Sequence, residues 1–345
     1  MSLGLENGDD TFALDFDFPP LPYPRNTDFT DFDSSAGITS LDASSNMMCD
    51  STDGEYRMVV GGSLNYMGQP CSTAQIAPSA RTRINWSIEQ LKLAPRSMVE
   101  QNGTPWQHSM LYENHMPRHL QDAYAACALY NARNGTNDEF VARFIRERVR
   151  DILADPIPQQ PNELLARAHA VMLYQIMLVF GGDVRLYSQA ELLLPLMEEI
   201  GTALLPLSAQ QIDPTGSLPF YPSTAASSAW AAYMFRESFR RTILSLYLFI
   251  TLCYLLRGET APCSTHLAFG NRFTLSAHLW NAKSAFEYAI AWNDEKHFLI
   301  EGLDFTEVMT SASPEDVDAF GKMIMIGLQG EDDIRGWLHT KGSTL

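Results

Sequence analysis

The sequence predicts an all-α body preceded by a disordered acidic arm. From Pro117 onward, apolar residues recur at helical spacing almost throughout. No convincing hairpin, βαβ unit or internal repeat is visible. Residues 1 to about 80 are instead rich in Asp, Ser, Gly and Pro and show no sustained period. We therefore expect a disordered arm and linker over residues 1–80 and one multi-helix domain over residues 85–345.

The first helices of this body are marked by periodicity and by stop signals. The segment Asn85–Leu93 is expected to begin the folded body, and Pro95–Pro105 to interrupt it. An Ala- and Leu-rich helix follows over His119–Ala132, and Asn134 with Gly135 ends it. The next helix has an apolar face made of Phe140, Val141, Phe144, Ile145, Val149 and Ile152. Pro156 ends this helix.

Two more helices lead to a long connection. Glu163–Phe180 is periodic and is followed by the stop signal Gly181 and Gly182. Leu186–Leu205 predicts a helix that bends near Pro195. A connection rich in Pro and Ser is then expected from Pro206 to Ser228.

Three helices are expected in the last third of the chain, over Ala229–Leu256, Phe273–Trp292 and Ser313–Leu328. The last has a clear start signal, with Ser313 as N-cap followed by Pro314. The first of them contains the apolar run from Ile243 to Leu256, which needs weighing as a membrane span. Its fourteen residues reach roughly 21 Å, short of a bilayer core of about 30 Å. A buried central helix fits this run better, and we expect no membrane partner.

The arm alternates acidic and aromatic residues, namely Asp9, Asp10, Phe12, Asp15, Phe16, Asp17, Phe18, Tyr23, Asp28, Phe29, Asp31, Phe32 and Asp33. This composition is typical of amphipathic disordered activation segments, which become ordered on a partner's hydrophobic groove. Its candidate activation surface is formed by Phe12, Phe16, Phe18, Phe29 and Phe32. The alternative is an acidic tail that only keeps the chain soluble.

Charge and cysteine content exclude several classes of protein. Residues 1–60 hold twelve acidic and two basic residues, a net charge of −10, whereas the remaining 285 residues carry −7. Unaided binding to nucleic acid is disfavoured, since phosphate neutralisation needs clustered Lys and Arg. The five cysteines are scattered, with no CxxC pair, so we expect reduced intracellular thiols and no disulfide or zinc framework. The N-terminus does not resemble a signal peptide.

A search for catalytic or metal-binding motifs finds no constellation. His108, His115 and His119 come nearest to a metal cluster, but Pro117 separates the last two and no third ligand has a useful spacing. The acidic run Glu331–Asp333 lacks a further acid at metal-binding spacing and fits a helix start or a solvated turn. GxSxG, P-loop and GxGxxG motifs are absent. We therefore expect neither an enzyme nor a bound cofactor.

Three charged residues beside the most apolar segment form the remaining candidate site. Glu237 precedes Arg240 and Arg241 by three and four residues, so all three share one part of a helix. Charges this close to a core are usually paired, because an unpaired buried charge is expensive. An ion-pair network that joins this helix to its neighbours is one interpretation. Direct binding of phosphate or of an effector is the other.

Four segments resemble the regulatory region of fungal six-cysteine binuclear zinc cluster transcription regulators. Trp230–Leu244, with its Glu-Ser-Phe-Arg-Arg-Thr core, is similar to the "W..W…ESVRRT" helix of that family. The other three are Met116–Tyr130, Leu275–Trp280 with Ser284–Glu287 and Trp292, and Ser313–Gly321 with the turn from Gly330 to Trp337. They occur in family order and cover roughly residues 85–340. The resemblance implies a helical regulatory domain, a nuclear location and control of transcription, often of a secondary-metabolite gene cluster. It also marks Trp230, Glu237, Arg240, Arg241 and Trp280 as family-motif positions with a structural role.

One departure from the family changes the expected mechanism. The family's DNA-binding module needs six cysteines in two close clusters, whereas Cys49 and Cys71 are the only cysteines before Cys127. We therefore expect a positive regulator that acts through a DNA-bound partner and contacts co-activators through its arm. A conventional member whose zinc module is missing from this sequence, and an unrelated helical enzyme or ligand-binding protein, are the alternatives. A homodimer is compatible with the aromatic and Met-rich faces.

Overall fold

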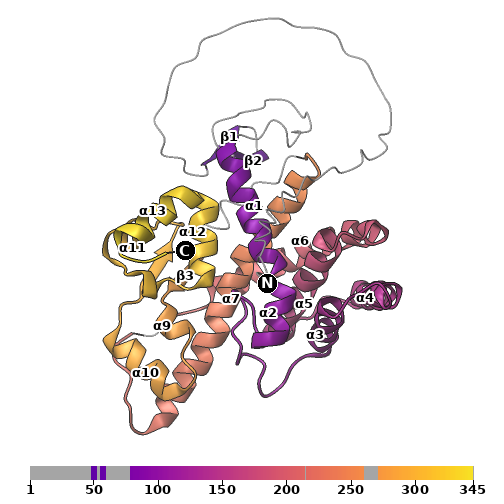
Figure 1. Cartoon of the computed structure of the whole chain (residues 1–345). Helices are drawn as coiled ribbons and strands as arrows, with labels where there is room; N and C mark the ends of the chain where they lie inside the picture. Colours follow the sequence, from indigo (N-terminus) through magenta and orange to yellow (C-terminus); the bar gives the residue numbers. More distant parts are fainter. Residues whose placement is uncertain (1–47, 53–54, 60–77, 214, 260–270, 345) are drawn as a thin grey trace, which may run out of the picture. The chain divides into compact units, whose positions relative to one another are not determined.

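The computed structural model of the chain describes residues 48–52, 55–59, 78–213, 215–259 and 271–344 (Figure 1). The body is helical, as the sequence predicts. Most of its helices share one hydrophobic core, and a second, smaller cluster is formed by Tyr233, Leu279, Ala282, Tyr288 and Ala291. Most of the expected arm, including the five phenylalanines of the candidate activation surface, lies outside the described residues. The disorder expected there stays a prediction.

Two short strands precede the helices and contradict the expectation that no hairpin is present. β1 (Met48–Thr52) and β2 (Glu55–Val59) pair antiparallel, with Met48 opposite Val59 and Thr52 opposite Glu55. Both strands are five residues long, too short for an alternation of polar and apolar residues to stand out from a polar segment.

The body begins earlier than predicted and is not interrupted at Pro95. α1 spans Pro78–Lys92, and α2 follows over Ala94–Gln101. Pro95 occupies the first turn of α2, where the missing N–H would have no partner within the helix. Proline therefore starts a helix here instead of breaking one.

The next helices agree with the predicted ones in order and in type. They are α3 (Arg118–Asn131), α4 (Asp138–Ala154), α5 (Pro161–Phe180) and α6 (Tyr187–Ala209), with the 3-10 turn η2 (Val184–Leu186) before α6. α6 continues through both Pro195 and Pro206, so the helix is longer than expected. The expected apolar face of α4 is buried at Val141, Ile145, Val149 and Ile152, whereas Phe140 is exposed.

α7 (Ser223–Leu256) is the central element of the body (Figure 1). It packs against α5 and α6 on one side and against β3 and α10 on the other. Both α5 and α7 are long and apolar enough to span a membrane, yet 83% and 72% of their most apolar windows are buried in the fold. Burial inside a helical body accounts for the apolar run from Ile243 to Leu256.

The single helix predicted over Phe273–Trp292 is wrong. This segment forms β3 (Arg272–Leu275), α9 (Ala277–Trp280) and α10 (Ala285–Asp294). Ser276 and Ser284 divide it, because each side chain accepts a hydrogen bond from a backbone N–H in the first turn of the helix that follows. β3 pairs antiparallel with β4 (Phe298–Glu301).

The C-terminal segment also contains shorter elements than predicted. α11 spans Thr306–Ser311, and Ser313 starts the 3-10 turn η3 (Pro314–Asp316) in place of a long helix. A second cap, Asp318, starts α12 (Ala319–Gln329). The expected turn after Gly330 is the helix α13 (Glu331–Thr340), and its first turn holds the three acids of the Glu331–Asp333 run.

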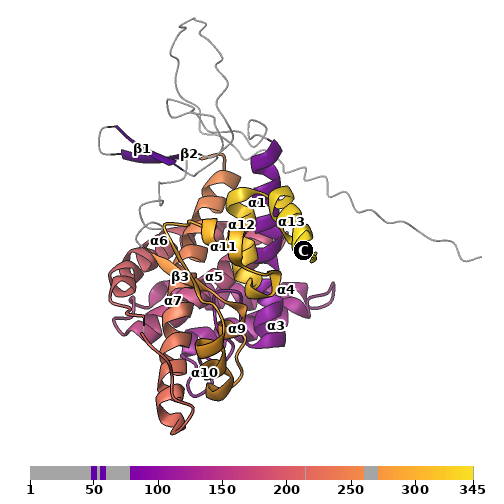
Figure 2. The same ribbon diagram turned by 90° about the vertical axis from the view of Figure 1, so that its left-hand side faces the viewer.

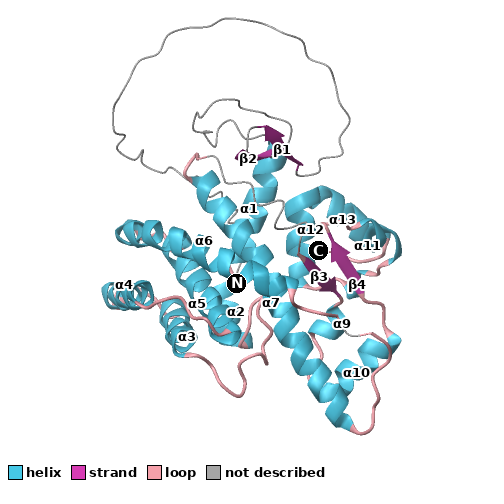
Figure 3. Ribbon diagram, turned by 180° about the vertical axis from the view of Figure 1, so that it is seen from behind, coloured by secondary structure: helices cyan, strands magenta, loops and turns pink. Residues whose placement is uncertain are grey.

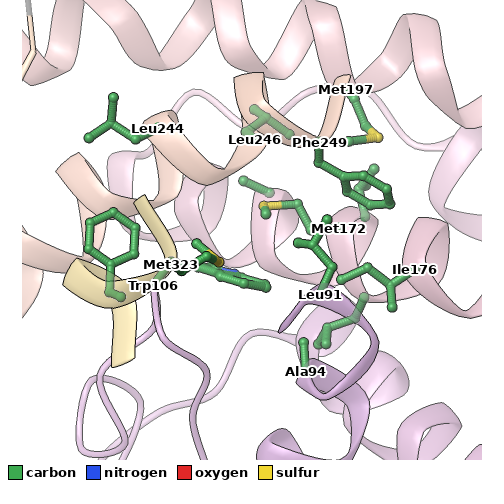
Figure 4. Close-up of a cluster of buried hydrophobic side chains, with 14 of the residues drawn as sticks. Leu91, Ala94, Trp106, Met172, Ile176, Met197, Leu244, Leu246, Phe249 and Met323 are labelled. Atoms are coloured by element: carbon green, nitrogen blue, oxygen red, sulfur yellow. The ribbon is translucent and has the colours of Figure 1, made fainter. Parts of the chain in front are cut away.

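Helices from both sides of α7 contribute to one core. Figure 3 shows α3 to α6 on one side of α7 and the segment from β3 to α13 on the other, and Figure 2 shows α12 and α13 beside α1. α1 contacts both groups, since it packs against α5, α12 and α13. The core shown in Figure 4 is filled by Leu91, Ala94, Trp106, Met172, Ile176, Met197, Leu244, Leu246, Phe249 and Met323.

Candidate functional site

The family-motif positions lie on two neighbouring elements. Trp230, Glu237, Arg240 and Arg241 belong to α7, and Trp280 is the last residue of α9. Glu237, Arg240 and Arg241 are buried, although each would be charged in water. Their side chains divide into an inner and an outer cluster.

The inner cluster is centred on Arg241, whose side chain is fully buried. Nε lies 3.0 Å from Glu237 Oε1, and Nη1 lies 2.6 Å from Asp318 Oδ2. Nη2 donates a hydrogen bond to the carbonyl of Thr274 over 3.0 Å, and Nη1 donates to that of Pro105 over 3.4 Å. One guanidinium group therefore joins α7 to β3, to the cap of α12 and to the segment before α3.

Aromatic rings enclose the same guanidinium group. Its carbon Cζ lies 3.8 Å from the ring centre of Trp280 and 4.9 Å from that of Phe320. Such contacts favour a cation, particularly out of water. His108 lies edge-on against Trp280, with 5.0 Å between ring centres. Because its side chain has no exposed surface, Arg241 cannot bind a ligand from solvent. Its contacts instead hold neighbouring segments of the fold together.

Electrostatics in the inner cluster follow from burial and pairing. Burial raises the pKa of Glu237, against the lowering effects of Arg241 and Arg240 and of the hydrogen bond from the Thr274 N–H. Burial alone would lower the pKa of Arg241, but the carboxylates of Asp318 and Glu237 outweigh it and hold the pKa above its ordinary value. Arg241 is therefore a permanent positive charge in the core.

The outer cluster is centred on Asp213, in the connection between α6 and α7. Arg240 binds its carboxylate in a bidentate manner, with Nη1 2.7 Å from Oδ1 and Nη2 3.0 Å from Oδ2. Arg236, one turn earlier on α7, places Nε 3.1 Å from Oδ1. Arg272 of β3 places Nε 3.2 Å from Oδ2 and lies 3.4 Å from Glu301 of β4. Three arginines therefore share one carboxylate.

This outer cluster reaches the surface. The side chains of Arg236 and Arg240 are 6% and 1% exposed, whereas those of Asp213 and Arg272 are 25% and 41% exposed. Burial raises the pKa of Asp213, but hydrogen bonds from Arg240 and the charges of the three arginines together lower it below its ordinary value. Asp213 is thus a firmly ionised carboxylate at the entrance to two buried arginines.

The histidines considered as metal ligands are separated in the structure. His108 Nδ1 accepts a hydrogen bond from the backbone N–H of Met110 over 3.2 Å, while His119 Nε2 lies 3.1 Å from Asp155. Within the part of the chain that the structure describes, no three His, Cys, Asp or Glu side chains come together as a metal site.

The two thiols that the structure describes in the helical body are unsuited to nucleophilic chemistry. Cys127 and Cys253 are buried, and burial raises their pKa values to about 12 and about 11. A thiol with such a pKa stays protonated at neutral pH, and the thiolate is the reactive form. What the outer cluster of α7 offers is positive charge and hydrogen-bond donors.

Sequence reasoning missed four participants, namely Asp213, Arg236, Arg272 and Asp318. Arg236 precedes Arg240 by one helical turn, so the helical repeat alone could have included it. Asp213 and Asp318 lie 27 and 77 residues from their arginine partners, and no spacing rule connects them.

Comparison with known proteins points to transcription. No family model matches the chain, and no solved structure matches it. The chain is similar to the transcription factor gsfR2 of Penicillium aethiopicum, with 29% identity over 270 residues. The match covers 75% of this chain and 63% of the relative, so the chain spans less than two thirds of that protein's length. The relative is a fungal transcription factor, in agreement with the family resemblance of the four sequence segments.

Proposed function

We propose that this protein is a fungal transcription regulator whose helical body is a regulatory domain. The observation that carries the proposal is the 270-residue similarity to a fungal transcription factor. Its support from the fold is the arrangement of the motif residues of α7, which join distant segments of one helical body. We place the protein in the nucleus and assign it a positive role, in the control of a secondary-metabolite gene cluster.

The proposed mechanism relies on a DNA-bound partner. The acidic arm, with Phe12 to Phe32 as its binding surface, contacts co-activators, while the helical body binds the partner or a second copy of the chain. The net charge of −17 supports this division of labour, because direct contacts to phosphates would need clustered basic residues. No catalytic step and no cofactor are part of the proposal.

A second candidate is a factor that binds DNA itself through a zinc cluster located outside this sequence. It is favoured by one observation, namely that the similar transcription factor extends well beyond the matched region. The intact mass of the native protein, isolated through a C-terminal tag, separates the two. A mass equal to that of the 345-residue chain, 38.6 kDa, supports the partner mechanism, and a larger mass supports the zinc cluster.

The proposal is tested by deleting the gene and profiling transcripts under conditions in which the protein is present. We expect a coherent set of genes, preferably clustered, to fall together and to recover when the gene is restored. An unchanged transcriptome would overturn the proposal and favour a helical enzyme or ligand-binding protein. A fluorescent fusion that stays out of the nucleus under the same conditions would also contradict it.

A further inference from the structure

The outer cluster of α7 has more hydrogen-bond donors than its carboxylate can satisfy. A guanidinium group carries five N–H donors and one positive charge, whereas a carboxylate offers two oxygens and one negative charge. Arg240 takes the bidentate position on Asp213, and Arg236 and Arg272 approach it through Nε. One carboxylate therefore serves three cations, and the ion pairs of the described residues add one second acid, Glu301, at the outer edge.

Arg236 is the least well satisfied member of this cluster. Its Nε is buried and lies 3.1 Å from Asp213 Oδ1, yet it is not directed well enough to form a hydrogen bond. Its Cζ lies 5.7 Å from the ring centre of Tyr233, and the buried hydroxyl of Tyr233 has no hydrogen-bond partner among the described residues. Buried polar groups are normally satisfied, so the interior side of this cluster has unused binding capacity.

A second multi-charge cluster of the same body is evenly balanced. Arg133, Arg146 and Arg185 are there paired with three carboxylates, those of Asp138, Glu139 and Asp183. Arginines and acids are equal in number in that cluster, as expected for a closed structural network. The excess of arginine is a property of the Asp213 cluster.

We propose that Arg236, Arg240 and Arg272 form a binding site for a small oxyanion, a phosphate group or a carboxylate, which enters by replacing the side chain of Asp213. The ligand group must be small because two of the three arginines are almost fully buried, and the exposed edge of Arg272 provides the entrance. A phosphate group suits the site well, since its additional oxygens reach donors that two carboxylate oxygens leave unused. Asp213 occupies the site in the free protein as an internal competitor.

The connection that carries Asp213 contains a natural reporter of this exchange. Trp292 of α10 donates a hydrogen bond from Nε1 to the carbonyl of Gly216 over 2.9 Å. Asn293 holds Leu218 through two hydrogen bonds of 2.8 and 2.9 Å. Displacement of Asp213, three residues before Gly216, is therefore expected to alter the surroundings of the Trp292 indole.

The test is a fluorescence titration of the purified full-length chain with inorganic phosphate and, in parallel, with citrate. Sodium chloride at matched ionic strength controls for screening. We expect a saturable change in tryptophan emission that is absent from the Trp292→Phe variant. A response to phosphate alone assigns the site to phosphate groups, and a response to citrate alone assigns it to carboxylates.

Variants of the cluster test the competition. Asp213→Asn removes the internal competitor while keeping its shape, so phosphate or citrate should bind at least tenfold more tightly. Arg272→Gln, at a partly exposed position that leaves the buried pairs intact, should weaken binding by a similar factor. Asp138→Asn is the matched control, since it also removes a carboxylate shared between two arginines, and should leave affinity unchanged.

Three results would overturn the proposal. The first is that neither anion produces more than the chloride response in the wild-type chain and in Asp213→Asn. The second is an equal gain in affinity in Asp138→Asn, which would indicate a general charge effect. The third is that Arg272→Gln binds phosphate or citrate with unchanged affinity. This result can be obtained even if Asp213→Asn does not fold. All of these measurements use the purified chain, so their outcome is separate from the transcript profile that tests the proposed function.

Discussion

Arg241 and Asp318 join the middle of α7 to the start of α12 through a single carboxylate. Asp318 Oδ2 lies 2.6 Å from Arg241 Nη1, while Oδ1 accepts a hydrogen bond from the backbone N–H of Gly321 over 2.8 Å. The same carboxylate thus caps a helix and neutralises a buried cation. Because the two residues are 77 positions apart, this pair connects segments that are distant in the sequence.

Removal of this cation should be costly. We expect Arg241→Met to lower the free energy of unfolding by about 3–5 kcal/mol, because Glu237 and Asp318 would remain as uncompensated buried carboxylates. Urea unfolding followed by circular dichroism measures the change. The double variant Glu237→Gln with Arg241→Met should recover part of the loss.

A surface pair provides the matched control. Arg335 and Glu331 on α13 are 2.6 Å apart, also with a spacing of four residues, but the Arg335 side chain is 59% exposed. Arg335→Met should cost less than about 1 kcal/mol. Equal losses of unfolding free energy in Arg241→Met and Arg335→Met would show that the inner cluster does not stabilise the fold more than a surface ion pair does.

Buried histidines should make the body sensitive to acid. His169 is fully buried between the Tyr112 hydroxyl at 3.2 Å and the Thr242 hydroxyl at 2.7 Å, and burial lowers its pKa to about 3. Burial likewise lowers the pKa of His108 to about 4. An unfolded histidine has a pKa near 6.5, so the unfolded state takes up the proton first as the pH falls.

The contribution of these histidines is therefore complete above pH 6.5 and is lost as the pH falls toward their folded pKa values. We expect about 1.4 kcal/mol of lost stability per pH unit for each histidine between pH 6 and 4.5. Denaturant unfolding across this range gives the free energy of unfolding as a function of pH. Its slope against pH should correspond to about one proton fewer taken up on unfolding in His169→Gln than in the wild type. An identical slope in the two proteins would contradict the assignment.

The spacing of apolar residues predicts the long helices correctly. It fails for short segments whose structure depends on pairing with a distant part of the chain. α3 to α7 are long enough for apolar residues to repeat on one face several times, so their order and type follow from the sequence. β3 and β4 have four residues each, and their structure depends on pairing between Phe273 and Ile300, 27 positions apart. A short apolar run beside an Ala-rich segment has the sequence pattern of a helix. The sequence therefore predicts one helix over Phe273–Trp292, where the structure has a strand and two short helices.

The candidate site was predictable to the same partial extent. Glu237 and Arg241 are one helical turn apart, so their ion pair follows from local geometry. Arg240 points to a different face of α7 and pairs with Asp213, which lies in a connection without any periodic pattern. Which acid meets which arginine is determined by the packing of α6, α7 and β3, and this information is not present in local spacing.

Two glycines in helices should respond in opposite ways to alanine. A Cβ atom at Gly201 of α6 would lie 2.9 Å from the hydroxyl oxygen of Tyr247 and 3.1 Å from its ring carbon Cζ, whereas one at Gly336 of α13 meets nothing within 4 Å. We expect Gly336→Ala to stabilise the protein by about 0.5–1 kcal/mol through helix propensity. Gly201→Ala should destabilise it, because an overpacking cost of about 1–3 kcal/mol exceeds that gain.

Thermal unfolding compares the two glycine variants directly. Tyr247→Phe removes the oxygen that the new methyl group would approach most closely. The decrease in Tm of the double variant Gly201→Ala with Tyr247→Phe should therefore be smaller than the sum of the decreases in the two single variants. A Gly201→Ala variant with a higher Tm than the wild type would show that α6 and α7 are not in close contact at this position.

The acidic arm provides the last prediction, which separates an activation segment from a solubilising tail. Residues 1–60 fused to an unrelated DNA-binding domain should activate a reporter gene. Replacement of Phe12, Phe16, Phe18, Phe29 and Phe32 by Ala should abolish activation, because exposed rings supply the binding energy for a hydrophobic groove and carboxylates alone do not. Five serines of the same segment, Ser34, Ser35, Ser40, Ser44 and Ser45, replaced by Ala form the matched control and should leave activation intact. Equal activity of the two five-site variants, at equal protein levels, would mean that the aromatic residues are not recognised and that the arm only keeps the chain soluble.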